Sequence, residues 1–310
     1  MKRFQKILYI VTTAAAQEAT SKRVHSLAKQ NGAQVCFVRI LEESFIEQMG
    51  KVFSSSIKEL TTLAQEHLQG ELQQFAEDAR WSDISTTSAL LTGRDFIKII
   101  EKVQRDQHDL VVKSRITAEE PDQLAMKLFR KCPCPVWIIR GSHQNTEKQI
   151  LAALDLQNTH LENRKLNRKI IELAHSMAVR EKGQVHYLNT LQLEYEGMMR
   201  GPRFKISEEE ITGMKDNLHQ ISSENLAVLF EETGITAAPE NIHLIEGDAG
   251  KIIPQAIQNL STDTLVMGTV ARSGIPGLLI GNKAEKILSE VQCTVLAVKP
   301  EGFISPVKIT

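Results

Sequence analysis

The sequence predicts two tandem doubly wound α/β domains, each with a five-stranded parallel sheet flanked by helices. The chain has 310 residues, about twice a typical domain length of ~150 residues. It also repeats itself internally, and short β-branched runs alternate with helical patterns, as in parallel sheets built from βαβ units. The polar stretch 141–148 separates the two copies, so we expect domains at 1–143 and 146–310.

The internal repeat rests on three pairs of similar segments that occur in the same order in both halves. These pairs are 6–11 with 149–154, 108–112 with 263–267, and 131–139 with 291–298. Three ordered matches indicate a duplication. In this alignment Lys113 takes the place of Gly268.

Ten short apolar runs, five in each half, have the composition of buried parallel strands. They cover 7–11, 34–40, 86–91, 109–112, 135–139, 149–154, 184–189, 241–245, 263–267 and 294–298.

The segments between these runs favour helices. Apolar residues recur at i, i+3, i+4 and i+7 over 96–103, 253–260 and 284–291, as on helices that cover a sheet. Longer amphipathic stretches lie at 54–78 and 207–232. The stretch 192–206 is predicted to be an irregular long loop, and a lid or a partner surface is left open.

Composition excludes several classes of function. The formal net charge is -1, which disfavours a protein that binds nucleic acid or a membrane surface. The apolar run 7–11 is too short for a signal peptide or a membrane span, so we expect a cytoplasmic protein. Cys132 and Cys134 have no second cysteine pair nearby, and we interpret them as buried thiols rather than metal ligands.

A strand, a glycine-rich loop and a helix start follow one another at 267–282. Glycines let backbone amides approach phosphate oxygens closely, and a helix start attracts anions. Asn282 is a favoured N-cap for the helix. No G-x-G-x-x-G follows the first strand of either half, which disfavours a dinucleotide site. The alternative is a loop that only packs the helix against the sheet.

This segment resembles the G-x2-G-x9-G-(S/T) loop of ATP-binding universal stress proteins. The spacing matches from Gly268 through Ala271 to Gly281 and Asn282, with Ala271 in place of the second glycine and Asn282 in place of Ser or Thr. Asp155 matches the family's ribose-binding carboxylate after strand one; capping of a helix or turn is its alternative role. The first-half Cys-Pro-x-Pro-Val-Trp and the second-half Leu-x-Gly-Asn are similar to the tandem E-type members of the family.

The resemblance implies an adenine-nucleotide alpha-hydrolase-like fold and a stress-response binding protein that supports resistance to stress, including DNA damage. It implies ATP or a related adenine nucleotide in the C-terminal domain only, held by Asp155, Met267, Gly268, Ala271, Gly281 and Asn282. We expect no enzyme and no metal, since no residue here demands the slow ATP hydrolysis known in the family. The alternative is a nucleotide-free interaction or structural module with both sites degenerate.

The first half departs from the family's pattern. Thr12 replaces the carboxylate, residues 113–135 contain no glycine, and Glu119, Glu120 and Asp122 would repel phosphate. We therefore interpret its nucleotide site as lost. In the family such domains pair through their last strands, here 135–139 and 294–298, which implies an internal pseudo-dimer and leaves further association of two chains open.

Overall fold

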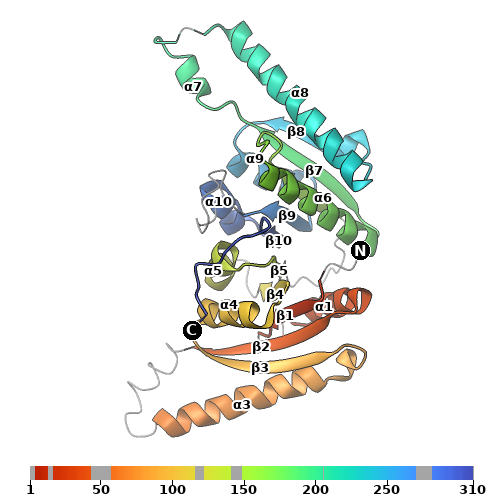
Figure 1. Ribbon diagram of the computed structural model, residues 1–310, viewed down its shortest axis with the longest axis vertical. Helices are drawn as coiled ribbons and strands as arrows, with labels where there is room; N and C mark the ends of the chain where they lie inside the picture. Colours follow the sequence, from red (N-terminus) through yellow and green to blue (C-terminus); the bar gives the residue numbers. More distant parts are fainter. Residues whose placement is uncertain are drawn as a thin grey trace. The chain divides into compact units, whose positions relative to one another are not determined.

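The computed structural model describes residues 4–12, 17–42, 57–115, 122–140, 149–204, 206–269 and 281–309 (Figure 1). The chain divides into two compact units. Unit 1 comprises Met1–Asn145 with Phe303–Thr310, and unit 2 comprises Thr146–Gly302. Within the described part of the chain, no helix is both long enough and apolar enough to cross a membrane.

Unit 1 is an α/β domain with a parallel sheet in the order β3-β2-β1-β4-β5. Its described elements are β1 (Lys6–Ile10), α1 (Gln17–Asn31), β2 (Gln34–Glu42), α3 (Ile57–Glu77), β3 (Thr86–Gly93), α4 (Asp95–Asp106), β4 (Leu110–Arg115), α5 (Gln123–Lys131) and β5 (Val136–Arg140).

Unit 2 repeats this order as β8-β7-β6-β9-β10, again with every strand parallel to its neighbours. Its described elements are β6 (Gln149–Leu154), α6 (Leu161–Glu181), β7 (Gln184–Leu191), α7 (Glu196–Met199), α8 (Glu208–Thr233), β8 (Ile242–Glu246), α9 (Ala249–Asn259), β9 (Thr264–Gly268), α10 (Asn282–Glu290) and β10 (Thr294–Val298).

The predicted fold class is confirmed: both units are five-stranded parallel α/β domains with flanking helices. The central strands are buried because helices cover both faces of each sheet, and β6 is buried at every residue after Gln149. Figure 1 shows α6 and α8 beside the unit 2 strands, where α6 packs on β6, β7 and β9. The stretch 192–206, predicted to be irregular, contains the short helix α7.

The two units differ in the chemistry of their cores. Tyr9, Phe37, Phe75 and Trp81 form a cluster of edge-on and tilted aromatic contacts in unit 1, with Phe37 and Trp81 centroids 4.9 Å apart. Unit 2 has an aromatic contact between Tyr187 and Phe230, with centroids 5.0 Å apart, and aliphatic residues such as Ile170 and Ile171 are buried along α6. All four cysteines are buried thiols outside any disulfide.

The backbone register corrects one alignment made from sequence. Ile10 of β1 pairs with Lys113, whereas Ala153 at the equivalent place in β6 pairs with Met267. Lys113 therefore takes the position of Met267, and the next residue, Ser114, takes that of Gly268.

The cause of this shift is a pair of aspartates that precede the fourth strand of each unit. Asp109 accepts hydrogen bonds from the amides of Gln5 and Lys6, and Asp263 accepts one from the amide of Gln149. Each aspartate also donates its own amide to strand one, to the carbonyl of Lys6 or of Gln149. The two aspartates are therefore equivalent, one residue away from the match that sequence similarity suggested.

Candidate functional site

A cavity of about 370 Å³ lies at the carboxyl ends of β6, β7 and β9 in unit 2. Ligands of open α/β sheets bind at this edge, where the strand order reverses. Five of the six residues predicted for the nucleotide site line the cavity: Asp155, Met267, Gly268, Gly281 and Asn282. The sixth, Ala271, lies outside the described residues.

The backbone of Asp155 is held in place by two asparagines of α6. The Asp155 amide donates to Oδ1 of Asn167 at 3.1 Å, and the Asp155 carbonyl accepts from Nδ2 of Asn163 at 2.7 Å and of Asn167 at 2.8 Å. The Asp155 carboxylate does not cap α6, whose N-cap is His160. Asp155 is thus a half-buried acid on a fixed backbone beside the cavity.

The next residue is fixed in the same way. The Leu156 amide donates to Oδ1 of Asn189 at 3.0 Å, and its carbonyl accepts from Nδ2 of Asn225 at 2.9 Å. These asparagines were not among the residues predicted for the site. The spacing of Asn163 and Asn167, four residues apart, is visible in the sequence, but their hydrogen bonds to Asp155 are not.

Gly268, the last residue of β9, lies under α6. A Cβ atom built at Gly268 would come within 2.8 Å of Cδ2 of Leu166 and 3.5 Å of its Cγ. The glycine therefore serves the packing of α6 on the sheet as well as the opening of the cavity. Both interpretations of this glycine, as a structural residue and as a residue of the site, have a physical basis.

The start of α10 differs from the prediction by one residue. Gly281 is the N-cap, with φ -62° and ψ 140°, and its carbonyl accepts the Glu285 amide at 2.9 Å. The predicted N-cap Asn282 is thus wrong: it is the first helical residue, because the Gly281 carbonyl already closes the first turn. A helix start leaves its first amides without intrahelical acceptors, and here those amides lie beside the cavity.

Lys283 brings a positive charge to this helix start. Its Nζ donates to Oε1 of Gln192 at 2.5 Å and lies 3.4 Å from Oδ2 of Asp248. Asp248 is the N-cap of α9, where its side chain accepts the Gly250 amide at 3.0 Å. The lysine therefore links three segments at the carboxyl edge of the sheet.

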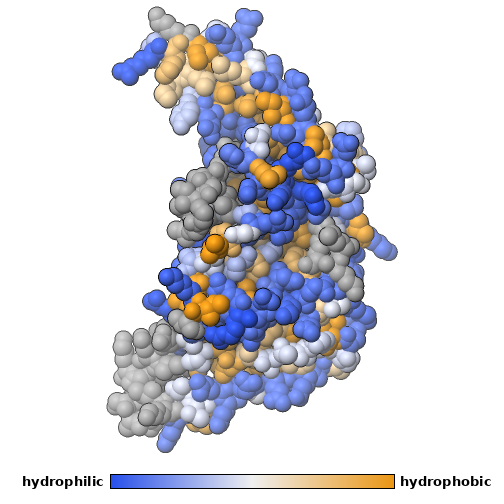
Figure 2. Space-filling model, viewed as in Figure 1, coloured by the Kyte–Doolittle hydropathy of each residue, from blue (hydrophilic) through white to orange (hydrophobic). Residues whose placement is uncertain are grey.

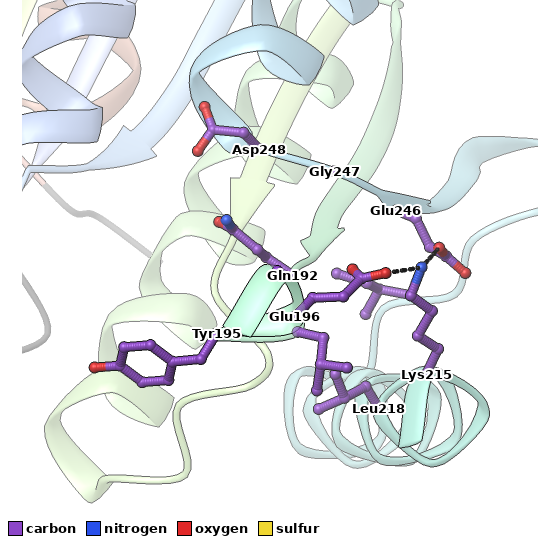
Figure 3. Close-up of a pocket in the computed structure, with 11 residues that line it drawn as sticks. Gln192, Tyr195, Glu196, Lys215, Leu218, Glu246, Gly247 and Asp248 are labelled. Carbon is purple, nitrogen blue, oxygen red and sulfur yellow. Dashed lines mark hydrogen bonds and ion pairs between the residues drawn. The ribbon is translucent and has the colours of Figure 1, made fainter. Parts of the chain in front are cut away.

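A second cavity, of about 450 Å³, lies between the ends of β7 and β8 and the helices α7 and α8. Figure 3 shows Lys215 between Glu196 and Glu246, at 3.1 and 3.0 Å. Hydrogen bonds from Arg200 and Lys215 lower the pKa of Glu196, and those to Glu246 and Glu196 raise the pKa of Lys215. Gln192 lines both cavities, so they are neighbours.

The surface near this second cavity is partly hydrophobic. Figure 2 shows orange side chains over α7 and the start of α8. Tyr195, Met198, Phe204 and Met214 are exposed there, and Tyr195 adopts a left-handed backbone with φ 62°.

At the equivalent edge of unit 1, polar side chains bind one another. The hydroxyls of Thr12 and Ser114 lie 2.9 Å apart, at the positions that Asp155 and Gly268 hold in unit 2. The ammonium of Lys113 forms an ion pair with Asp122, and both side chains are largely buried. Asp122 also caps α5 by accepting the Ala125 amide at 2.9 Å.

The model of the Universal stress protein family matches the chain twice, over residues 3–140 and 148–299. The chain belongs to the universal stress protein family. The two matches cover both halves, so the duplication predicted from the sequence is a tandem of two universal stress domains, as in the E-type members.

Two curated relatives match most or nearly all of the chain. Universal stress protein E of Photorhabdus laumondii is 22% identical over an alignment of 323 positions, which covers 99% of each chain. Universal stress protein E of Escherichia coli K12 is 26% identical over 227 residues, 70% of this chain and 69% of that protein.

Two solved structures share the fold. A functionally unknown protein from Pseudomonas aeruginosa PAO1 aligns with a TM-score of 0.70 and 23% identity, over 97% of this chain and 95% of that one. A universal stress protein from Archaeoglobus fulgidus aligns with a TM-score of 0.59 and 12% identity, over 97% and 98%.

Proposed function

We propose that this universal stress protein binds ATP or a related adenine nucleotide in the cavity of unit 2 and acts as a stress-response binding protein. The observation that carries the proposal is the meeting of Asp155, Gly268 and the start of α10 around one cavity. A carboxylate beside free helix amides suits a ligand with a ribose hydroxyl at one end and a phosphate at the other.

The size of the cavity is consistent with this ligand. Small-molecule sites commonly have volumes of about 300–1,000 Å³, and this cavity has about 370 Å³. Its walls combine apolar side chains such as Ile253 and Ile287 with a few polar groups. Apolar walls can hold the flat face of a base while the polar groups orient the sugar and the phosphates.

We further propose that the protein is a binding protein rather than an enzyme, and that it supports resistance to stress, including DNA damage. Asp155 is the one acid that the sequence analysis assigned to the site. A ribose-binding role needs it as a hydrogen-bond acceptor, which requires neither a nucleophile nor a proton transfer. Unit 1 then serves as a structural or interaction domain.

Titration calorimetry of the full chain with ATP, ADP and AMP tests the proposal. We expect one site per chain. Gly281→Asp should abolish binding, because it places a carboxylate where phosphate would lie, while the Gly281 backbone, at φ -62°, accepts any residue. The matched control is Gly213→Asp, the same change at an exposed glycine of α8 with nothing within 4 Å of its Cβ position.

Two results would contradict the proposal. Wild-type protein that gives no heat and no thermal shift at millimolar nucleotide would favour the nucleotide-free interaction module. Binding that survives Gly281→Asp unchanged would place the nucleotide elsewhere in the molecule.

A further inference from the structure

The contacts of Lys283 suggest how the site distinguishes its ligands. Among the described residues that line the cavity, Lys283 is the one cation, while Asp155 and Glu194 are acids. It is the second residue of α10, directly beside the helix amides. A ligand phosphate at those amides would lie within reach of the ammonium group.

Lys283 is held by two partners from other segments. Gln192 follows β7, and Asp248 precedes α9. In Figure 3 the side chains of Gln192 and Asp248 lie on the same side of the second cavity, away from the Glu196–Lys215–Glu246 bridge. The ammonium therefore already has a carboxylate counter-ion and an amide acceptor in the absence of ligand.

The ion pair is easy to exchange. The side chain of Lys283 is 54% exposed and that of Asp248 is 35% exposed, with a separation of 3.4 Å. Exposed pairs of this kind contribute little to stability. A phosphate oxygen offers the lysine a shorter, charge-assisted hydrogen bond. The lysine can therefore exchange its partner at small cost.

Asp248 itself is held in place. Its carboxylate caps α9 through the Gly250 amide, and a Cβ at Gly250 would come within 2.9 Å of Oδ1 of Asp248. The cap fixes Asp248, whereas Lys283 is a flexible side chain. When a phosphate replaces Asp248 as the partner of Lys283, the lysine therefore moves and Asp248 stays as a nearby negative charge. That charge disfavours each additional phosphate of the ligand.

We propose that Lys283 binds the phosphate group of the ligand. Asp248 is the counter-ion of Lys283 in the free protein, and the phosphate replaces it. This inference rests on the proposed nucleotide site and names the pair of residues that sets its phosphate preference.

Calorimetry of the full chain with adenosine, AMP, ADP and ATP tests the pair. Lys283→Met should weaken ATP binding about tenfold, the usual effect of losing a hydrogen bond to a charged group, and should leave adenosine binding unchanged. Lys283→Arg should restore most of the loss. Asp248→Asn keeps the α9 cap, because Asn is an equally good N-cap, and should strengthen ATP binding more than AMP binding.

The matched control is Lys286→Met. Lys286 is an exposed lysine one turn further along α10 that does not line the cavity. Equal losses from Lys283→Met and Lys286→Met would overturn the inference, because they would indicate a general charge effect. An equal loss for adenosine and ATP in Lys283→Met would also overturn it.

The same titrations distinguish failure of the proposed nucleotide site from failure of the Lys283–Asp248 pair. If the wild type binds none of the four ligands, the proposed function and the inference fall together. If the wild type binds ATP and Lys283→Met binds it equally well, only the inference is wrong.

Discussion

At the carboxyl edge of its sheet, unit 1 carries Asp122 at the N-cap of α5, the position that Gly281 holds at the start of α10 in unit 2. After strand one the difference is reversed, with Thr12 in unit 1 and Asp155 in unit 2. Of these two positions, unit 1 has its acid at the helix start, and unit 2 has its acid after strand one.

This exchange changes what the helix start can bind. In unit 1 the Asp122 carboxylate already accepts the Ala125 amide, and Lys113 neutralises it from the fourth strand. In unit 2 the N-cap is a glycine with no side-chain hydrogen bond. A helix start that is occupied by its own carboxylate has no room for an external anion, whereas one capped by glycine has. The residue at the N-cap therefore decides whether this helix start is occupied by the protein's own carboxylate or is open to a ligand.

The largest effect on stability is expected from breaking the buried ion pair between Lys113 and Asp122 in unit 1. Asp122→Ala leaves Lys113 charged and buried and removes the α5 cap, and should cost about 3 kcal/mol of unfolding free energy. Both tryptophans of the chain, Trp81 and Trp137, lie in unit 1, so denaturation followed by tryptophan fluorescence reports on this unit.

A double variant gives the control. Lys113→Met with Asp122→Asn removes both charges and retains a capping side chain, so it should cost clearly less than Asp122→Ala. An Asp122→Ala variant as stable as the wild type would break the comparison, because the carboxylate would then not hold the edge of unit 1 together.

An intermediate effect is expected at Gly268. Gly268→Val forces Leu166 to move and should cost about 2 kcal/mol through overpacking, measured by hydrogen exchange of the β9 amides. Leu166→Ala in the same chain should recover part of that cost, and a double-mutant cycle gives the coupling. Additive changes for Gly268 and Leu166 would show that the two do not compete for space.

At the equivalent place in unit 1, Ser114→Ala should cost about 1 kcal/mol, the usual value of one lost hydrogen bond such as that to Thr12.

The smallest effect concerns pH. Burial lowers the pKa of His186, with a further contribution from His243 at 3.1 Å, and burial also lowers the pKa of His243. A histidine whose pKa is lowered on folding stabilises the protein above its unfolded pKa of about 6.5, and this contribution is lost as pH falls through the folded value.

We therefore expect the stability of unit 2 to fall between pH 7.5 and 5 as these two histidines become protonated. Among the described histidines of unit 1, His108 is the one whose pKa is lowered, again by burial. Hydrogen exchange at the two pH values, corrected for the intrinsic rates, measures the loss in each unit. His243→Gln should reduce the loss in unit 2 and leave that of unit 1 unchanged; an unchanged loss in unit 2 would exclude the histidine pair as its source.

The fold was predictable because its signals are local. Apolar runs such as 149–154 and 294–298 became strands with the predicted bounds, since a parallel sheet covered on both faces requires continuous burial. The site was only partly predictable. The spacing of its loop is visible in sequence, but the asparagines that hold Asp155 contact it from α6, and such contacts are not visible in the order of residues.

Two errors have the same origin. The alignment of Lys113 with Gly268 followed side-chain similarity, whereas hydrogen bonds from strand-one amides to Asp109 and Asp263 set the register. The N-cap assigned to Asn282 followed residue preference, whereas the carbonyl of Gly281 closes the first turn. In both cases a tertiary or backbone contact overrode a local preference.

The asparagine hydrogen bonds around Asp155 and Leu156 have a consequence for the thermodynamics of binding. Ordering a flexible loop at the moment of association subtracts from affinity. Here Asn163, Asn167 and Asn189 already fix this turn in the free protein. A ligand would meet a preorganised turn and lose little conformational entropy on this side of the cavity, so most of any structural response to binding should arise at α10 and Lys283.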